Sequence, residues 1–484
     1  ERMLKIALIF LTLLALVLLV SAGFILEKAN RTPRELAPYI ERRASGHNPV
    51  IVGLGNWLGK TLRALDRMDA VVALPALSLG AQTGDWRNAH ASQDADAGHL
   101  ILVGSAEQAR LAIANANPGD VITFLPGVYQ FSASNIIVNK AGRADAPMIV
   151  RAAVPGTVKV ELALTEGFHV SAPYWIFENL HIRGVCQVQS NCEHAFHVVG
   201  NGHHFVARNN TIVDFNAHVK INKEGAYIPD DGVIEYNTIS NTEVRRTEHS
   251  VTLIDLVAAS RWRIEHNVIT DFIKGGSDRI SYGAFAKGGG KDNRIASNVI
   301  ICEHRLHGNP GQRVGLSLGG GGTGKAYCPD QRCITEQDGG VLESNLVMAC
   351  SDDGIYLNKA ATSRIIKNTL IDTGGIEVRF AESTADVEAN LVDGKIRARD
   401  GGLIRSRHNI DTNMLSLFLG HHPVRQLFRH PSEFDLRWSD KPKAVSISTS
   451  ASKDLCGMPS SPPAVAGAFD DFNACLSTSL AVPK

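Results

Sequence analysis

The chain repeats one short pattern of apolar and polar positions about eight times: an apolar residue, two variable residues, Asn, one variable residue and another apolar residue. Residues 234–239 and 264–269 are clear copies. The repeated asparagines are Asn179, Asn210, Asn237, Asn267, Asn298, Asn345, Asn368 and Asn390, and the steps between them are 31, 27, 30, 31, 47, 23 and 22 residues. Short strands rich in β-branched residues at this spacing predict a parallel β-helix.

The recurring Asn suits a corner of such a coil. Its backbone tolerates left-handed geometry, and its amide can hydrogen-bond to the Asn of the next coil. A β-sandwich or a propeller is the alternative, but the copies lack paired hairpin turns and the period is too short for a four-stranded blade. We interpret the 47-residue step as two coils plus an insertion, because residues 313–318 read as a strand of their own.

The patterns divide the chain into four parts. We expect a transmembrane anchor in residues 1–30, amphipathic helices and a linker in 31–98, a right-handed parallel β-helix in 99–410, and a tail in 411–484 that packs on the solenoid. The fold class is therefore all-β with a few short helices. Helices are expected at 32–43, 56–67 and 107–115, the last of them capping the open end of the first coil. The first two either lie at a membrane surface or are ordinary packing helices.

The N-terminal segment is strongly apolar. Residues 6–26 carry no charge and follow Arg2 and Lys5, and about 20 such residues span a bilayer. A cleavable signal peptide is the alternative, because residues 20–22 resemble a cleavage site. With positive charge before the span, we expect a single-pass protein of a bacterial inner membrane with its bulk in the periplasm.

Charge and cysteine content narrow the function. Lys plus Arg and Asp plus Glu are both 49, so net charge indicates no nucleic-acid partner. The eight cysteines fit an oxidising compartment and allow four disulfides whose connectivity the sequence leaves open. Zinc is an alternative for Cys328 and Cys333, although no Cys-x-x-Cys pair supports it.

The opening of the predicted solenoid resembles a known superfamily. Residues 118–120, 125–129 and 146–150 resemble the first turn of pectate-lyase-like β-helices, and especially the chondroitinase B and alginate lyase group, polysaccharide lyase family 6. Residues 353–359, 375–380 and 394–400 resemble uncharacterised membrane-anchored β-helix proteins of bacteria. The lyase resemblance implies an acidic polysaccharide substrate, a Lys that removes the C5 proton of a uronic acid, a calcium ion held by carboxylates, and an assisting Arg.

The lyase motif is present only in part. Lys287, in residues 284–290, matches the base. The two Glu expected seven and five residues earlier are Ile280 and Tyr282, and residues 315–320 contain no Arg.

Several charged residues are candidates for a site. We expect Lys287 to act with His304, Arg305 and His307 from the next coil as a catalytic cluster; the alternative is a set of solvated side chains. Arg379 and Lys359 are candidate substrate contacts, or members of a structural ladder of salt bridges. Asp352 and Asp353 are candidate calcium ligands or an acid–base pair, or a solvated corner.

Two functions follow from these patterns. The first is a membrane-anchored periplasmic β-helix that binds or cleaves an acidic polysaccharide, with β-elimination as the reaction. The second is a catalytically inactive structural or accessory subunit of a membrane or envelope assembly.

Overall fold

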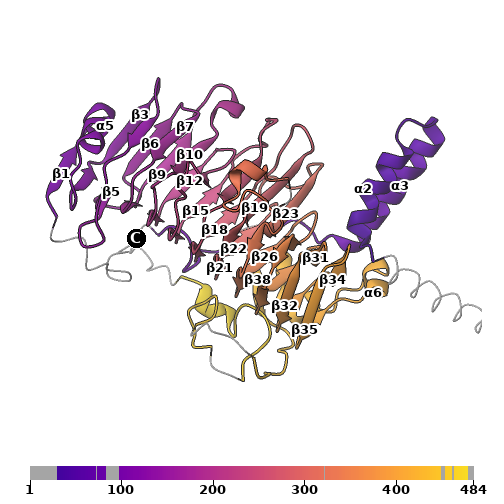
Figure 1. Cartoon of the computed structure of the whole chain (residues 1–484). Coiled ribbons are helices and arrows are strands. Elements are labelled where there is room, and N and C mark those ends of the chain that lie inside the picture. The colour runs from indigo at the N-terminus through magenta and orange to yellow at the C-terminus, as the bar shows by residue number, and fades with distance from the viewer. Residues whose placement is uncertain are drawn as a thin grey trace, which may run out of the picture.

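The computed structural model describes residues 30–71, 74–82, 98–320, 322–447, 453–460 and 463–477. Within them the chain winds into coils, and each coil adds one strand to each of three parallel sheets, as a right-handed parallel β-helix requires. Figure 1 shows the solenoid running from β1 at one end to β35 at the other, with a helical hairpin projecting from the late end. The predicted fold class is confirmed for the solenoid.

Sheet 1 has 12 strands among the described residues. They are β1 (Leu100–Val103), β2 (Val121–Phe124), β5 (Met148–Ala152), β8 (Trp175–Glu178), β11 (Val206–Arg208), β14 (Val233–Glu235), β17 (Arg263–Glu265), β21 (Arg294–Ala296), β25 (Val341–Glu343), β29 (Ser363–Ile366), β32 (Thr384–Glu388) and β35 (Leu403–Arg407).

Sheet 2 has 11 strands in the same part of the chain. They are β3 (Gly127–Phe131), β6 (Val158–Leu162), β9 (His181–Gly184), β12 (Thr211–Val213), β15 (Thr238–Ser240), β18 (Val268–Thr270), β22 (Val299–Ile301), β26 (Leu346–Met348), β30 (Thr369–Ile371), β33 (Leu391–Val392) and β36 (Ile410–Asp411).

Sheet 3 has 10 strands where the structure describes the chain. They are β4 (Ile136–Val138), β7 (Glu166–Val170), β10 (His194–Val199), β13 (Val219–Asn222), β16 (Val251–Val257), β19 (Ile280–Lys287), β23 (Gln312–Gly319), β27 (Ile355–Asn358), β31 (Gly375–Arg379) and β34 (Lys395–Arg399). A small sheet is formed by β20 (Gly290–Lys291), β24 (Gln337–Asp338) and β28 (Ala360–Ala361).

One helix covers the open end of the first coil, and further helices lie outside the coils. The helix α5 (Ala106–Ala114) begins after Ser105, whose side chain accepts a hydrogen bond from the Gln108 backbone N–H, and buries Ala109 and Ile113 against the first coil. The others are α2 (Pro33–Ala44), α3 (Pro49–Asp66), α6 (Met414–Phe418) and the 3₁₀ turns η1 (Gln189–Asn191), η2 (Lys325–Tyr327), η3 (Arg425–Leu427), η4 (Pro431–Glu433) and η5 (Phe472–Cys475).

An asparagine ladder runs along the corner between sheets 1 and 2. The backbone N–H of Asn237 donates to Oδ1 of Asn267 at 2.8 Å, and Nδ2 of Asn237 donates to the same oxygen at 3.0 Å. The same pair of bonds joins each member to the next. The ladder comprises Asn210, Asn237, Asn267, Asn298, Asn345, Asn368, Asn390 and Asn409. The predicted stacking of asparagines at one corner is confirmed.

Two details of the corner differ from expectation. The left-handed residue is the one before each ladder Asn, such as Tyr236 (φ 53°) and His266 (φ 58°). Asn179 has φ 65° and so occupies this preceding position, while Leu180 stands in the ladder and donates its N–H to Asn210. The role of the ladder asparagines is therefore their amide hydrogen bonds, and not a left-handed backbone.

The 47-residue step is one coil and not two. Asn298 bonds directly to Asn345, so these residues lie on adjacent coils. The extra length lies in the connections on either side of β23, which belongs to the same coil as β22. The strand expected at 313–318 exists, but it supplies the third side of this coil.

The eight cysteines form four disulfides. The pairs are Cys186–Cys192, Cys302–Cys350, Cys328–Cys333 and Cys456–Cys475. The zinc alternative for Cys328 and Cys333 is thus excluded. Cys302 follows β22 and Cys350 follows β26, so this bridge staples adjacent coils.

The described part of the C-terminal tail covers the outer face of sheet 2. Phe428, Phe434, Phe469 and Phe472 pack with outward-facing apolar residues of β22, β26 and β30 in a second buried cluster. The antiparallel pair β37 (Phe428–His430) and β38 (Asp435–Trp438) lies in this tail. Residues 74–82 join it as a strap: Leu77 pairs with Leu476, and Gly80 donates its N–H to the His266 carbonyl.

The helical hairpin α2–α3 differs from the sequence prediction at one helix. The first helix is as expected, with Thr32 as N-cap and Pro33 at its first position. The second begins at Pro49, seven residues before the predicted start, because the Asn48 side chain caps the Val50 and Ile51 N–H groups. None of the described helices is long and apolar enough to cross a bilayer, and the predicted span at 6–26 lies outside the described residues.

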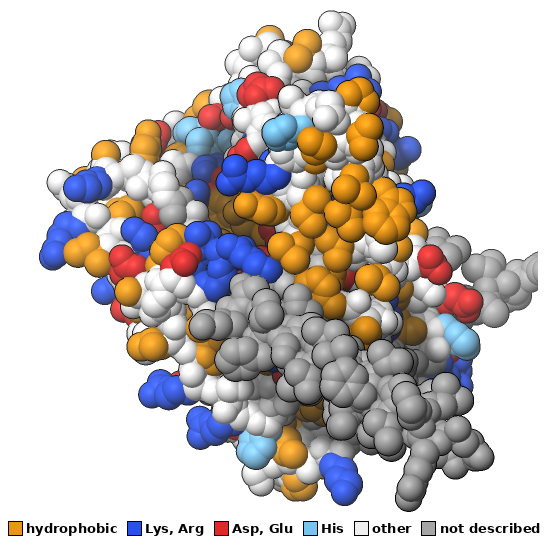
Figure 2. Space-filling view, turned by 90° about the vertical axis from the view of Figure 1, so that its right-hand side faces the viewer, with side chains coloured by type: hydrophobic (Ala, Val, Ile, Leu, Met, Phe, Trp, Pro, Cys, Tyr) orange, Lys and Arg blue, Asp and Glu red, His pale blue; other side chains and the backbone are white. Residues whose placement is uncertain are grey.

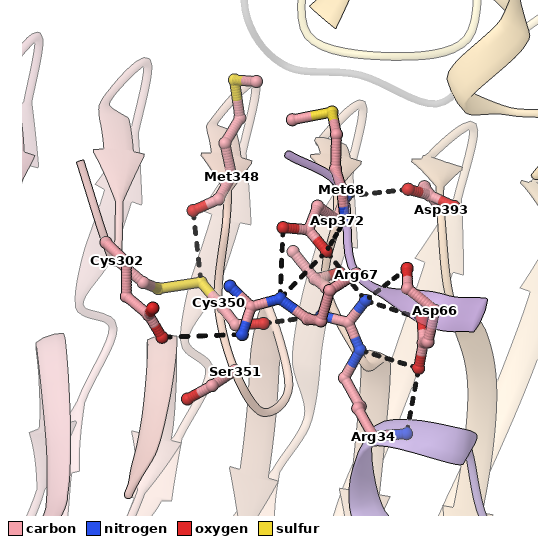
Figure 3. Close-up of polar contacts among 12 residues, drawn as sticks. Arg34, Asp66, Arg67, Met68, Cys302, Met348, Cys350, Ser351, Asp372 and Asp393 are labelled. Atoms are coloured by element: carbon pink, nitrogen blue, oxygen red, sulfur yellow. Dashed lines mark hydrogen bonds and ion pairs between the residues drawn. A yellow bond between two sulfur atoms is a disulfide. The ribbon is translucent and has the colours of Figure 1, made fainter. Parts of the chain in front are cut away.

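Arg34 clamps the hairpin to the solenoid (Figure 3). Its side chain is 1% exposed and forms a two-pronged pair with Asp66, at 2.7 and 3.0 Å. It also donates to the Cys350 carbonyl at 2.6 Å and to Asp372 at 3.0 Å. Arg67 adds a second contact to Asp372. One buried arginine therefore joins the start of the described chain to its late coils.

Replacing Asn267 by Leu is expected to lower the free energy of unfolding by about 1–3 kcal/mol for each polar group left unpaired. The substitution leaves the Asn237 backbone N–H without its acceptor. Urea unfolding measures the change. Asn201→Leu, at an exposed turn, is the matched control. Equal effects of the two substitutions would contradict a stabilising role for the ladder.

Replacing Arg34 by Met is expected to destabilise the protein by about 3–5 kcal/mol, because Asp66 and Asp372 stay buried without their main cation. Limited proteolysis of the hairpin and chemical unfolding both measure this loss. Arg31→Met is the control, since the 42% exposed Arg31 precedes α2 and pairs with Glu35 inside the hairpin rather than with the solenoid. A hairpin that stays as protease-resistant as the wild type would show that the clamp is dispensable.

Candidate functional site

The outer face of sheet 3 carries Lys287 and a series of other charged, hydroxyl and imidazole side chains. Strand register aligns them in rows along the solenoid axis. The central row reads His169, His197, Lys220, Asp255, Phe285, Ser317, Tyr356, Glu377 and Arg397. A second row, two residues further along each strand, contains Val257, Lys287, Gly319, Asn358, Arg379 and Arg399.

Lys287 ends β19 in the second row. It is half-buried, with Nζ 4.6 Å from the centroid of the Phe285 ring. Burial lowers the pKa of Lys287, and nearby Lys220 acts in the same direction. Gly320 lies against its stem, since a Cβ there would be 2.8 Å from Lys287 Cδ. The side chain remains on the outer face, beside the glycine-rich insertion, with part of its surface open.

Lys220 and Asp255 form the neighbouring ion pair. Lys220 Nζ lies 2.7 Å from Asp255 Oδ2, on β13 and β16. Both side chains belong to the central row, so a ligand on this face meets a cation, a carboxylate and the Lys287 amine within adjacent strands. Neither Lys220 nor Asp255 is among the site residues that the sequence predicts.

His304, Arg305 and His307 lie at the other end of the strands. Gln312, which follows this loop, pairs with Ile280 at the beginning of β19, whereas Lys287 is at its end. Eight strand residues extend over roughly 25 Å. The structure thus separates the three residues from Lys287 instead of grouping them around one sugar. Their loop is held by Asp271, which accepts hydrogen bonds from the N–H groups of His304 and Arg305.

Asp352 and Asp353 belong to a buried charge cluster around Arg397. Arg397 donates to Asp353 at 2.8 Å and to Glu377 at 2.9 Å, and it contacts Glu35 of α2 at 3.1 Å. Burial raises the pKa of Asp352 to about 6 and that of Asp353 well above its ordinary value. At this cluster the Arg397 guanidinium supplies the positive charge where the sequence suggested a calcium ion.

Arg379 and Lys359 lie on late coils. Arg379 is in the same row as Lys287, three strands further on, paired with Asp400 at 2.5 Å and stacked on Phe380. Lys359 follows β27 and is 3.9 Å from Glu382. Arg379 therefore fits both predictions made for it: it forms a salt bridge between coils, and it remains a partly exposed cation on the outer face of sheet 3.

A group missed by the sequence analysis lies near the early end of the central row. Glu166 Oε2 is 2.9 Å from His169 Nδ1, and Glu166 Oε1 is 2.9 Å from His197 Nδ1. Among the residues described, these three are the set of His, Cys, Asp or Glu side chains whose ligand atoms gather closely enough for a metal ion. The imidazoles of His169 and His197 hold the pKa of Glu166 well below its usual range, and Glu166 raises that of His169.

The calcium ion implied by the lyase resemblance does not fit these residues. Calcium takes six to eight oxygen ligands. Beside Lys287, the positions of the two expected carboxylates are Ile280 and Tyr282, and Asp353 is engaged by Arg397. The early cluster offers two nitrogens and one carboxylate.

A pocket of about 720 Å³ lies between the hairpin and the loops that lead into β19, β23 and β27. Arg34, Glu35, Arg67 and Glu303 are among its lining residues. These charges pair with partners within the protein, as in the 3.6 Å contact of Arg67 with Glu303. We interpret this pocket as part of the contact between the hairpin and the solenoid.

Comparison with known proteins supports the fold. The pectate lyase Pel9A superposes with a TM-score of 0.53 at 15% identity, over 78% of this chain and 98% of that one. The fold is that of pectate-lyase-like β-helices. A polysaccharide lyase of the PL6 family from Pseudopedobacter saltans has a TM-score of 0.37 at 12% identity, over 65% of this chain and 93% of its own.

Sequence similarity is confined to a part of the chain. Pectate lyase L of Dickeya dadantii (strain 3937) is 29% identical over 150 residues, and that of Dickeya chrysanthemi is 27% identical over the same length. The match covers 28% of this chain and 31% of either relative. No protein-family model matches the chain.

Proposed function

We propose that the protein binds an acidic polysaccharide along sheet 3 and cleaves it by β-elimination. The observation that carries the proposal is the half-buried Lys287, whose pKa is lowered by burial, on the outer face of a β-helix like that of Pel9A. A long open face suits a polymer better than an enclosed pocket would.

The chemistry assigns separate tasks to two lysines. In β-elimination a base takes the C5 proton of a uronate, the C4–O bond breaks, and the departing sugar oxygen takes a proton from water. Lowering the pKa of Lys287 increases the fraction of neutral amine that can act as base. The Lys220 ammonium, held by Asp255 at 2.7 Å, is the neighbouring cation that would stabilise negative charge developing on the uronate carboxylate.

The rows on sheet 3 also suggest how the polymer lies. Neighbouring strands are about 4.8 Å apart, so Arg379 is roughly 14 Å from Lys287 along the solenoid. A chain running along the axis would contact Lys287 and then the Arg379 guanidinium. Lys359, which follows Asn358 of the same row, would lie beside this path.

A catalytically inactive accessory subunit is the second candidate. The observation that favours it is the replacement of the lyase carboxylates by Ile280 and Tyr282, of which Tyr282 packs edge-to-face on Phe285. A binding face without turnover would keep the rows of sheet 3 but lose product formation.

Lys287→Met is expected to reduce turnover at least 100-fold, because the amine that accepts the proton is removed. Activity is followed by the ultraviolet absorbance of unsaturated product on alginate, chondroitin and pectate. Stability should change by less than about 1 kcal/mol, since the side chain is only half-buried. Wild-type rates should rise with pH as Lys287 deprotonates, with an apparent pKa below that of an ordinary lysine.

Lys291→Met, at an exposed position on the following strand β20, is the control and should keep wild-type activity. Polysaccharide binding without product from the wild type would favour the accessory-subunit function. Undiminished turnover by Lys287→Met would remove Lys287 as the base.

We further propose that residues 6–26 anchor the protein in a membrane and that the hairpin rests on the bilayer surface. Val50, Leu54 and Trp57 of α3 are 79%, 56% and 61% exposed. Figure 2, which views the molecule from the hairpin's end, shows a patch of hydrophobic side chains with basic residues beside it. The helix α2 begins seven residues after the apolar segment ends.

Trp57 provides a direct probe of this contact. In full-length protein reconstituted into vesicles, brominated lipids are expected to quench Trp57 fluorescence, because an exposed Trp prefers the interface. Trp57→Phe should remove most of the quenching, and Trp438→Phe, in the tail, should not. Quenching that is unchanged in Trp57→Phe would contradict bilayer contact, and self-association lost in this variant would assign the patch to a second copy of the chain.

A further inference from the structure

Glu166, His169 and His197 form a compact group on two adjacent strands of sheet 3. Glu166 and His169 come from β7, and His197 pairs with His169 across β10. Their side chains are 25%, 22% and 15% exposed, so the group is partly buried but reachable from the outer face of sheet 3. Asn135 steadies the carboxylate through a 3.2 Å hydrogen bond to Glu166 Oε2.

The hydrogen bonds around His197 fix which ring nitrogen faces the carboxylate. Asn222 Nδ2 donates to the Lys223 carbonyl, so its Oδ1 points at His197 Nε2, 2.7 Å away. Nε2 must therefore carry the proton in the neutral ring. In that neutral ring Nδ1 carries a lone pair, and it faces Glu166 Oε1 at 2.9 Å.

Two electron-rich atoms at this separation repel unless a cation lies between them. A second proton on His197 is one such cation, and a metal ion is the other. Because His169 presents its own Nδ1 to the same carboxylate, the three atoms converge on a single point, the arrangement of a metal-ligand set.

We propose that Glu166, His169 and His197 bind one divalent transition-metal ion, with zinc as the reference ion. Two imidazole nitrogens and a carboxylate oxygen are ligands that zinc prefers, at about 2.0–2.2 Å each. Tetrahedral ligands at that length are roughly 3.4 Å apart. Each imidazole nitrogen lies 2.9 Å from the carboxylate oxygen it faces, and all three ligand atoms lie within 4.8 Å of one another. The fourth position faces solvent on the outer side of sheet 3. Calcium is disfavoured because only one of the three residues offers oxygen.

The neighbouring histidine, His194, is not part of the proposed metal site. His194 Nδ1 faces the Ala217 carbonyl at 3.0 Å, and burial lowers the pKa of His194 to about 4, so it stays neutral. Lys220, next in the row, is paired with Asp255 at 2.7 Å. All eight cysteines are in disulfides and do not compete for the metal. The inference does not depend on the proposed polysaccharide chemistry.

Isothermal titration of chelator-treated full-length protein with ZnCl₂ tests the proposal. One equivalent of zinc should bind with a dissociation constant in the micromolar range or tighter, and CaCl₂ should give no heat at this site. Cobalt(II) should give the intense visible absorption of a low-coordinate nitrogen–oxygen site. Zinc should also raise the melting temperature, since it binds only the folded arrangement.

His169→Gln and His197→Gln should each weaken zinc binding at least 100-fold, while His430→Gln, an exposed histidine of β37, should leave it unchanged. Asn222→Leu should weaken binding by about tenfold through loss of the orienting hydrogen bond. Retention of the wild-type circular dichroism shows that the variants fold. Absence of a stoichiometric zinc site in the wild type, or zinc binding indifferent to His169 and His197, overturns the proposal.

Discussion

The asparagine ladder is the constraint on which the rest of the structure depends. Each ladder amide accepts from the backbone and side chain of the preceding coil and donates back to a strand carbonyl, as Asn267 does to Ile234 at 2.8 Å. A coil can then sit in only one register on its neighbour. Fixed register converts scattered residues into rows, so His169, His197 and Lys220 become neighbours on sheet 3. The candidate site exists because the opposite corner is locked.

The sequence predicted the coils well because the same residue type, Asn, recurs once in each coil. It could not say which of two adjacent corner residues takes the left-handed conformation, since Asn suits both tasks. Asn179 shows the ambiguity: it fills the left-handed position, and Leu180 fills the ladder. The 47-residue step was misread for a related reason, because strand pattern alone does not tell which side of a coil a strand such as β23 supplies.

For the site, the sequence correctly predicted that Lys287 lies on a strand, but it predicted the wrong neighbours for it. Sequence distance suggested that His304 was close, whereas the direction of each strand puts it at the far end. Asp353 looked free because its partner, Arg397, lies 44 residues away. The signal for the histidine pair was available: His169 and His197 are 28 residues apart, close to one coil by the asparagine spacing. Applying the repeat length to every residue type would have found them.

The clamp at Arg34 has a consequence for how the protein is made. Its acceptor Asp372 lies 338 residues further along the chain. At about 5–20 residues per second, a ribosome needs on the order of half a minute to produce that acceptor after Arg34. Coils can stack on one another as they emerge, each templated by the one before. The hairpin, although synthesised first, can dock only on finished late coils. Its docking therefore reports that synthesis has reached the end of the solenoid.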